Sequence, residues 1–266
     1  MKTRKAFTLI ELLVVISIIA MLLSILMPAL AIVKRQAQQV VCMANLSQWG
    51  LILTLYTEDH EGHFFAGYYD YTDPNGVSYT SSDSDLWPYA LESYYQVPKL
   101  MVCPGSRFNT PNIHDEEQIE KAGGDLSGGY GFNGWLGDTP EKVLQTEGHD
   151  TANSWRTMDH YGGAKIPLMA DALWYTGRPE SDDLPPKEEY SRSNIDLTDI
   201  SSDPSNHMRR FTVNRHREKV NVLFMDGVVK SISLKKLWRL KWHKNYDMSA
   251  PLPQWPEWMA SFDDPD

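Results

Sequence analysis

One acidic residue, Glu11, lies within a stretch at residues 7–33 that is otherwise uncharged. A carboxylate in lipid costs a few kcal/mol on insertion scales and less toward the bilayer edge, so it needs a cationic partner or a function. Because Glu11 lies near the beginning of the stretch, its carboxylate could instead reach the lipid headgroups. The chemistry expected of Glu11 is therefore electrostatic.

The only two cysteines, Cys42 and Cys103, allow one disulfide and exclude both a disulfide-dense scaffold and a metal site of four cysteines. Cys42 lies on a predicted packing face of a helix, and Cys103 ends a short apolar run before a Pro-Gly turn. A bridge between them would attach the helix to the rest of the chain and contribute about 4 kcal/mol in the chain-entropy model. Two buried free thiols are the alternative.

Nine residues separate His216 from the dipeptide Asp226-Gly227. The β-rich runs at residues 220–225 and 228–233 flank this dipeptide and predict a hairpin with a two-residue type I′ turn, in which Gly227 adopts a positive φ. A hairpin without chemistry is the simplest interpretation. Otherwise His216 would orient the hairpin through a hydrogen bond or stand near Asp226 in a small ion site.

His60 and His63 are three residues apart, but a metal site there needs further ligands that the sequence does not indicate. We therefore predict a polar turn at this position. The sequence has no Gly-rich phosphate loop, GxSxG motif or HExxH motif, so a hydrolase built on His60, His63 or His216 has no motif to support it.

The composition limits the possible partners. The 266 residues include 25 Lys and Arg against 35 Asp and Glu, a formal net charge of −10, which argues against a general nucleic-acid-binding protein. The chain also has 9 Trp, 13 Tyr and 8 Phe. We expect these aromatic residues to fill the core. A carbohydrate-binding platform is the alternative, because Trp and Tyr combine an apolar face with a polar tip.

The elements that position these residues begin with a membrane helix. Lys2, Arg4 and Lys5 precede the apolar stretch, and residues 7–33 are long enough to cross a bilayer at 1.5 Å per residue. The stretch exceeds the roughly 7 to 15 apolar residues of a cleaved signal peptide. Because a basic leader stays in the cytoplasm, we expect the chain after residue 34 to lie outside, which in a bacterium is the periplasm.

The helix is expected to continue over residues 34–58. Apolar residues recur there at spacings of four and three, which places them on one face that must pack against something. That face consists of Cys42, Leu46, Trp49, Leu53 and Tyr56. With turn residues following residue 58, the whole helix would measure on the order of 75 Å.

Residues 59–266 form the body. Residues 87–95 predict a short helix that closes onto the apolar face of the long one. Strands are predicted at residues 100–103, 129–136, 166–170, 220–225 and 228–233. The expected fold class is α+β, with a long N-terminal helix packed on an antiparallel β-sheet with long loops.

The string KAFTLIEL at residues 5–12 resembles the processing site of type IV prepilins and type II secretion pseudopilins, in which a membrane peptidase cleaves before the Phe and methylates the new amino terminus. The resemblance implies a basic leader peptide at residues 1–6, cleaved between Ala6 and Phe7, although Ala6 stands where the family commonly has Gly. It implies that Glu11 pairs with the new terminus of a neighbouring subunit and so sets the stagger of a filament. Pro28 matches a proline typical of these helices and allows a kink.

The spacing of His216, Asp226 and Gly227 resembles the H-X9-DG element of a large group of pseudopilin-like proteins. Both ends of the chain therefore point to one family. Major pseudopilins commonly bind calcium in a C-terminal loop, but no run here matches the spacing of a known calcium loop. We expect no cofactor and no metal ligand set, with calcium left open.

The resemblance implies a structural pilin-like protein without catalytic residues. The chain would reside in the bacterial inner membrane, N-terminus cytoplasmic and body periplasmic, and then enter a periplasmic or surface filament of a type II secretion or type IV pilus-like machine. Its partners would be prepilin peptidase, an inner-membrane assembly platform, other pseudopilins, copies of itself and membrane lipid, but no nucleic acid. The alternative is a membrane-anchored surface binding module, for example for glycans, because the body is larger than a minimal major pseudopilin needs.

Overall fold

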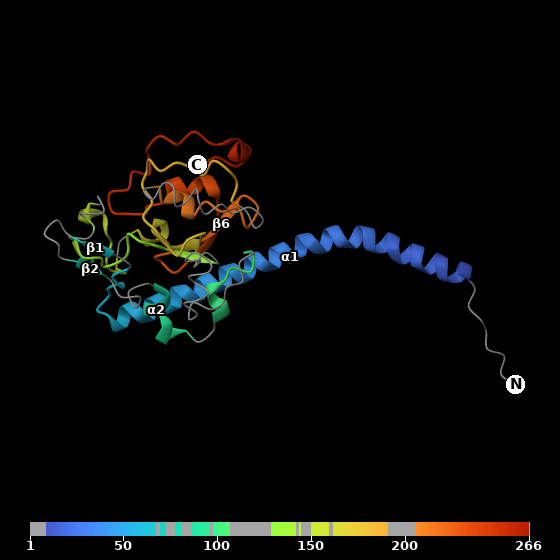
Figure 1. Cartoon of the computed structure of the whole chain (residues 1–266), viewed down its shortest axis with the longest axis horizontal. Coiled ribbons are helices and arrows are strands. Elements are labelled where there is room, and N and C mark those ends of the chain that lie inside the picture. Colours follow the sequence, from blue (N-terminus) through green and yellow to red (C-terminus); the bar gives the residue numbers. More distant parts are fainter. Residues whose placement is uncertain are drawn as a thin grey trace.

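The computed structural model describes residues 9–67, 70–72, 78–80, 87–95, 98–106, 129–141, 144, 150–159, 162–190 and 206–265. The expected leader at residues 1–6 and the expected cleavage site between Ala6 and Phe7 lie outside these residues. A long N-terminal helix and a five-stranded sheet organise the described part (Figure 1). The α+β layout expected from the sequence is confirmed.

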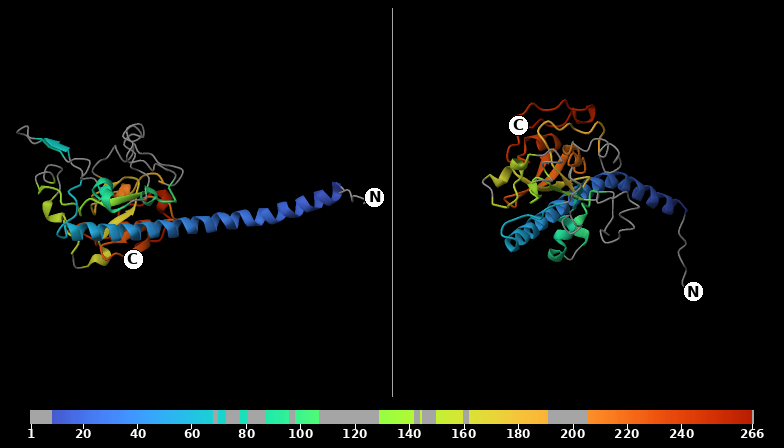
Figure 2. Two further views of the ribbon diagram at one scale, coloured as in Figure 1. Left: turned by 90° about the horizontal axis from the view of Figure 1, so that it is seen from below. Right: turned by 60° about the vertical axis from the view of Figure 1, so that its left-hand side comes forward.

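Helix α1 (Leu9–Asp59) has 51 residues and continues through Pro28, so it is about 77 Å long. Its first half projects away from the body, and its second half lies along the body (Figures 1 and 2). The helix ends in the predicted turn, where the Gly62 amide donates to the Thr57 carbonyl at 2.7 Å. Gly62 has a φ of +86°, a conformation that glycine adopts without steric cost after the last helical turn.

The main sheet has the strand order β5-β3-β4-β6-β7. Neighbouring strands pair antiparallel except β5, which runs parallel to β3, so the sheet is mixed rather than wholly antiparallel as expected. Its strands are β3 (Tyr130–Asn133), β4 (Pro167–Asp171), β5 (Thr176–Gly177), β6 (Lys219–Phe224) and β7 (Val229–Ser233). A separate two-stranded sheet pairs β1 (Asp70–Thr72) with β2 (Ser78–Thr80).

Short helices complete the described part. The helix predicted at residues 87–95 is present as α2 (Trp87–Ala90) followed by the 3-10 helix η2 (Glu92–Tyr94). The other 3-10 helices are η3 (Pro98–Met101), η4 (Thr151–Asn153), η5 (Gly163–Lys165), η6 (Met208–Arg210), η7 (Leu234–Arg239) and η8 (Glu257–Met259).

The strand predicted at residues 100–103 is wrong. The segment is the end of η3 followed by a single β-bridge between Val102 and Gly129. Side chains of α1 occupy two of its carbonyls: Trp49 Nε1 donates to Leu100 O at 3.1 Å, and Asn45 Nδ2 donates to Val102 O at 3.3 Å. These bonds use acceptors that a strand would offer to a neighbouring strand.

The predicted hairpin is present as β6 and β7, but its turn differs from the type I′ turn expected. The Gly227 amide donates to Phe224 O at 2.9 Å, and the Phe224 amide donates to Val228 O at 3.0 Å, so the loop has three residues. Only Gly227 in the loop has a positive φ, at +79°. This is the type I turn with a glycine bulge that is typical of three-residue hairpins, and Asp226 Oδ1 closes it by accepting from the Val228 amide at 3.1 Å.

The second half of α1 packs on strands β4, β6 and β7 through the predicted apolar face. Four of its members, Cys42, Leu46, Trp49 and Leu53, are fully buried, and Tyr56 is partly buried. The Trp49 ring meets the rings of Trp87 and Tyr95 edge-on at centroid distances of 5.0 and 5.1 Å. The helix therefore supplies one wall of the core.

Candidate functional site

The first half of α1 turns an apolar surface away from the rest of the chain. Every residue from 9 to 37 is exposed, and the side chains of Leu9 and Met21 are 86% and 70% exposed. The helix is long and apolar enough to cross a membrane, and none of its most apolar segment is buried, although a signal sequence passes the same test. An apolar surface of this size on a folded chain marks contact with lipid or with another protein.

The polar groups of this half are adapted to apolar surroundings. The hydroxyls of Ser17 and Ser24 donate to the carbonyls of Val14 and Met21, three residues back, at 2.8 and 2.7 Å. Such bonds satisfy a hydroxyl within the helix, without water. Glu11 lies in the first described turn of α1. It is the one acid in the exposed half.

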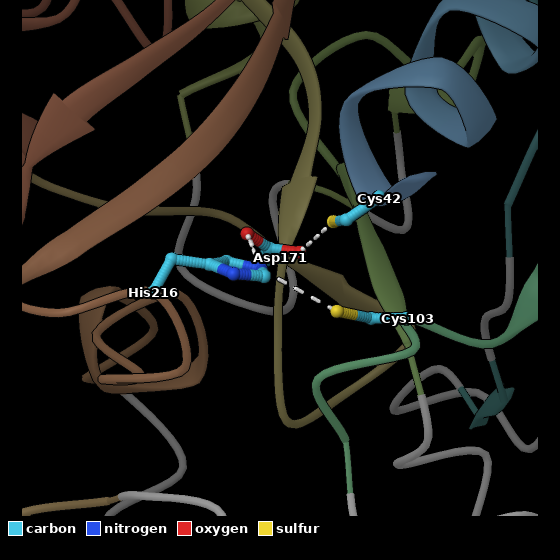
Figure 3. Close-up of side chains that lie close together, drawn as sticks. All are labelled: Cys42, Cys103, Asp171 and His216. Atoms are coloured by element: carbon cyan, nitrogen blue, oxygen red, sulfur yellow. Dashed lines mark hydrogen bonds and ion pairs between the residues drawn. The ribbon is translucent and has the colours of Figure 1, made fainter. Parts of the chain in front are cut away.

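Four polar side chains from distant parts of the sequence meet where α1 crosses the sheet (Figure 3). We call them the Cys-Asp-His cluster: Cys42, Cys103, Asp171 and His216. Cys42 comes from α1 and Asp171 from the end of β4, while Cys103 and His216 come from loops. Cys42, Cys103 and Asp171 are fully buried, and His216 is 5% exposed.

The distances within the cluster are short. Cys42 Sγ donates to Asp171 Oδ1 at 2.9 Å, and His216 Nε2 lies 3.3 Å from Asp171 Oδ2. His216 Nε2 is also 3.5 Å from Cys103 Sγ. Each residue contributes one atom that could bind a metal: a sulfur from each cysteine, a carboxylate oxygen from Asp171 and an imidazole nitrogen from His216. These four atoms all lie within 4.8 Å of one another.

The segment that carries Cys103 is fixed along α1 by three helix side chains. Trp49 and Asn45 bind the carbonyls of Leu100 and Val102 as described above, and Gln38 Nε2 donates to Pro104 O at 2.9 Å. The segment thus runs antiparallel to the helix over almost three turns. Because Cys103 lies between two of these carbonyls, its sulfur is held beside Cys42.

Charge and burial oppose each other in the cluster. Burial raises the pKa of Asp171, but the hydrogen bond and positive charge of His216 outweigh burial and leave that pKa below its ordinary value. Burial lowers the pKa of His216, whereas Asp171 and Cys103 raise it, with a net pKa of about 10. Burial raises the pKa of the Cys42 thiol, and a hydrogen bond from Cys42 lowers that of Cys103.

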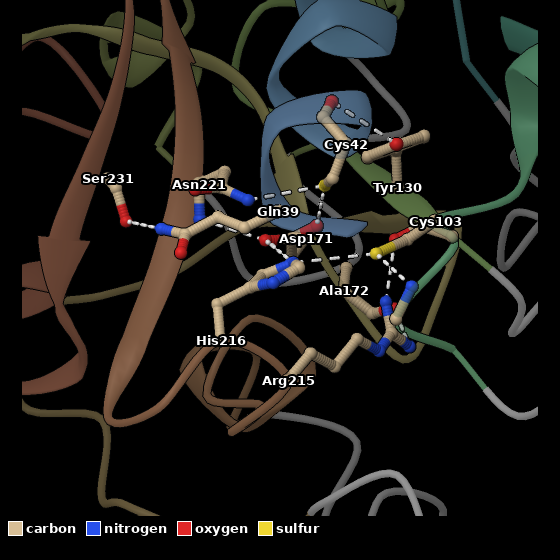
Figure 4. Close-up of polar contacts among 12 residues, drawn as sticks. Gln39, Cys42, Cys103, Tyr130, Asp171, Ala172, Arg215, His216, Asn221 and Ser231 are labelled. Atoms are coloured by element: carbon tan, nitrogen blue, oxygen red, sulfur yellow. Dashed lines mark hydrogen bonds and ion pairs between the residues drawn. The ribbon is translucent and has the colours of Figure 1, made fainter. Parts of the chain in front are cut away.

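A second layer of groups surrounds the cluster (Figure 4). The backbone N–H of Asn221 donates to Asp171 Oδ2 at 2.8 Å, and the side-chain Nδ2 of Asn221 donates to Cys42 Sγ at 3.3 Å. The Gly105 amide donates to Cys103 Sγ at 3.3 Å. Arg215 acts on Cys103 and Asp171 through its charge, and its guanidinium donates to Gly129 O and Ala172 O at 2.8 Å each. The Asp171 carboxylate and both sulfurs therefore each receive a further N–H donor from outside the cluster.

The sequence singled out three of these four residues but did not group them. The sequence predicted a contact between Cys42 and Cys103 but placed His216 beside Asp226, whose carboxylate instead closes the hairpin turn. Asp171 was missed. A signal existed, because an acid directly follows the apolar run at residues 166–170, and a buried carboxylate at a strand end needs a partner.

The two cysteines are free thiols in the structure. Their proximity fits the predicted contact between helix and body, and the disulfide itself stays a prediction.

The weaker candidates do not form a metal site in the described residues. His60 Nδ1 lies 2.7 Å from Tyr56 O, and His63 Nδ1 lies 3.1 Å from Asp138 Oδ2, so the two imidazoles have separate partners. Most of the nine tryptophans fill the core, as expected, and a glycan platform stays a prediction. Six are buried and three are partly buried: Trp49, Trp87, Trp135, Trp155, Trp238 and Trp242, then Trp174, Trp255 and Trp258.

Comparison with known proteins gives one match, at the N-terminus. Residues 1–27 match the family described as the prokaryotic N-terminal methylation motif. No curated protein and no solved structure matches the chain. The match supports a prepilin-like protein that is anchored in the membrane by its apolar helix, and it favours a structural subunit over an enzyme. It does not extend to His216, Asp226 and Gly227.

Proposed function

We propose that this chain is a pseudopilin: a subunit that prepilin peptidase cleaves between Ala6 and Phe7 and methylates at Phe7, and that then assembles into a filament. The filament belongs to a type II secretion or type IV pilus-like machine. Its further partners are other pseudopilins, copies of the same chain and an inner-membrane assembly platform. The N-terminus faces the cytoplasm before assembly, and the body lies in the periplasm.

One observation carries this proposal. A single uninterrupted helix is packed in its own body over one half and bare over the other, and the methylation motif at residues 1–27 includes the start of the bare half. A plain membrane anchor needs no rigid continuity with the domain behind it. A filament subunit does, because the helix must pass from lipid into a bundle of identical helices while it carries the body along.

Glu11 supplies the specificity in this proposal. Cleavage before Phe7 creates a cationic amine, and the Glu11 carboxylate of a neighbouring subunit can pair with it. The pair replaces hydration that both charges lose in an apolar environment. A subunit with the wrong axial position does not form this pair, so the pair sets the stagger between neighbours.

The first test is mass spectrometry of the full chain purified from native membranes. We expect the N-terminal peptide to begin with N-methylated Phe7. A protein that still begins at Met1 would overturn the proposal.

The second test separates a filament subunit from an anchored binding module. We expect Glu11→Ala to abolish filaments seen by electron microscopy while the protein remains in the membrane. The matched control is Glu58→Ala, an exposed acid near the other end of the same helix, which should assemble normally. Equal assembly of both variants would favour an anchored binder, whose ligand binding needs no Glu11.

A further inference from the structure

We propose that the Cys-Asp-His cluster is a structural zinc site that fastens helix α1 to the body. The inference goes beyond the filament function and does not depend on it. It rests on the identity, distances and burial of four side chains, none of which any match assigns to a metal.

The donor set fits zinc. Structural zinc in proteins is tetrahedral and takes Cys sulfur, His nitrogen and, less often, carboxylate oxygen. Two sulfurs, one imidazole nitrogen and one carboxylate complete such a set with no position left open. Calcium takes six or more oxygens and does not suit a site with two sulfurs.

The two distances from His216 fit as well. In a tetrahedral zinc site with bonds of about 2.0 Å to nitrogen and oxygen and 2.3 Å to sulfur, neighbouring ligand atoms are about 3.3 to 3.8 Å apart. His216 Nε2 is 3.3 Å from Asp171 Oδ2 and 3.5 Å from Cys103 Sγ. The 2.9 Å contact from Cys42 Sγ to Asp171 Oδ1 is a thiol hydrogen bond, and zinc displaces the proton that makes it.

The charges balance around the ion. Zinc binding releases the thiol protons and the Nε2 proton of His216 to solvent, so that both cysteines coordinate as thiolates and His216 as neutral imidazole. Two thiolates and one carboxylate leave the zinc site with one net negative charge. Arg215, fixed by its bonds to two backbone carbonyls, lies close enough to offset that charge.

The second layer has the features of a metal site. Backbone and side-chain N–H groups point at both sulfurs, from Gly105 to Cys103 and from Asn221 to Cys42. A Cβ on Gly105 would lie 3.2 Å from His216 Cε1 and 3.4 Å from Cys103 Sγ, so the close approach of this backbone depends on glycine. Outer-shell donors of this kind orient ligands and tune their basicity.

A disulfide between the two cysteines does not explain why Asp171 and His216 lie beside them. A bridge needs the two sulfurs about 2.05 Å apart and has no need of a carboxylate or an imidazole. A disulfide would leave the Asp171 carboxylate and the His216 imidazole paired only with each other and their backbone donors, whereas zinc coordinates both.

The test uses the full chain purified in detergent without added metal or chelator. We expect about one zinc per chain by elemental mass spectrometry, and both thiols to be protected from alkylation until the protein is denatured. Asp171→Asn and His216→Gln should each lower the zinc content at least tenfold. His243→Gln is the control, since His243 is also buried and paired with a carboxylate, Glu180, but lies outside the cluster.

Cobalt keeps the proposal testable if those variants fail to fold. The unsubstituted chain, stripped with a strong chelator and titrated with Co²⁺, should develop the visible bands of tetrahedral cobalt and a near-ultraviolet thiolate-to-cobalt band, saturating at one equivalent. Zinc should displace the cobalt. A metal-free native protein with a Cys42–Cys103 disulfide, a chain that binds neither ion, or zinc retained by both variants would overturn the proposal.

Discussion

The two halves of helix α1 share one backbone, but the first is apolar all round, the second is amphipathic, and their surroundings are opposite. From residue 42 onward, one face is covered by strands β4, β6 and β7 and by the segment at residues 100–104. From residue 9 to 37, no side chain is covered by the described part of the chain. An amphipathic face that finds its partner within the chain stabilises the fold, whereas an apolar surface all round the helix requires partners outside it. None of the nine tryptophans lies in the bare half: Trp49 is in the packed half of α1 and the other eight are in the body, so tryptophan fluorescence reports the unfolding of the packed part of the chain.

The largest expected effect comes from the packed half. Trp49→Ala removes a fully buried indole, its two edge-on ring contacts and its bond to Leu100 O, and should lower the free energy of unfolding by about 3 to 5 kcal/mol. Leu22→Ala, in the bare half, should leave the free energy of unfolding unchanged. The measurement is urea unfolding of the full chain in detergent, followed by fluorescence. Similar losses in both variants would mean that the bare half also packs on the body.

The next effect is a pH dependence confined to the body. Burial raises the pKa of Asp183 to about 7, so the folded state binds a proton that the unfolded state releases near pH 4. The free energy of unfolding should therefore fall as the pH rises from about 4 to 7, by no more than about 4 kcal/mol. Over the same range the bare half of α1 should stay helical by circular dichroism.

Asp183→Asn should flatten this pH profile. The neighbouring exposed Asp182→Asn is the control and should leave the slope almost unchanged. An equal slope in all three proteins would show that Asp183 does not carry the dependence.

A smaller effect should follow from filling the contact between helix and sheet. A Cβ on Gly50 would lie 3.0 Å from Leu223 Cδ1, so Gly50→Val should lower stability by about 1 to 3 kcal/mol although valine is the better helix former. Ala31→Val, which adds bulk to the bare half, should have no effect on the same urea transition. A stabilising Gly50→Val would show that Leu223 moves aside freely.

The smallest effect concerns the polar bonds that hold the segment at residues 100–104. Asn45→Ala leaves Val102 O without its helix donor and should lower stability by about 1 kcal/mol. Gln48→Ala, on the exposed side of the same helix, should change nothing in the fluorescence-detected transition. If Asn45→Ala also changes nothing, packing alone holds the segment.

Local pattern was enough to predict several features. The spacing of Cys42, Leu46, Trp49 and Leu53 predicted the buried face of α1, because helical periodicity depends only on neighbours along the chain. The β-rich runs on either side of Asp226-Gly227 predicted the hairpin for the same reason. The turn type was wrong because the loop has three residues instead of the two expected. The strand at residues 100–103 failed because donors from α1, more than fifty residues away in sequence, took its carbonyls.

The sequence by itself determined a charged leader, an apolar span with one acid, an amphipathic continuation and an α+β body, since each depends on composition or short-range spacing. Only the tertiary structure decided that Asp171 meets both cysteines and His216, and that a single helix is sheltered at one end and bare at the other. The physical reason is that burial and charge compensation arise between segments far apart in sequence, and no local spacing encodes which of them meet.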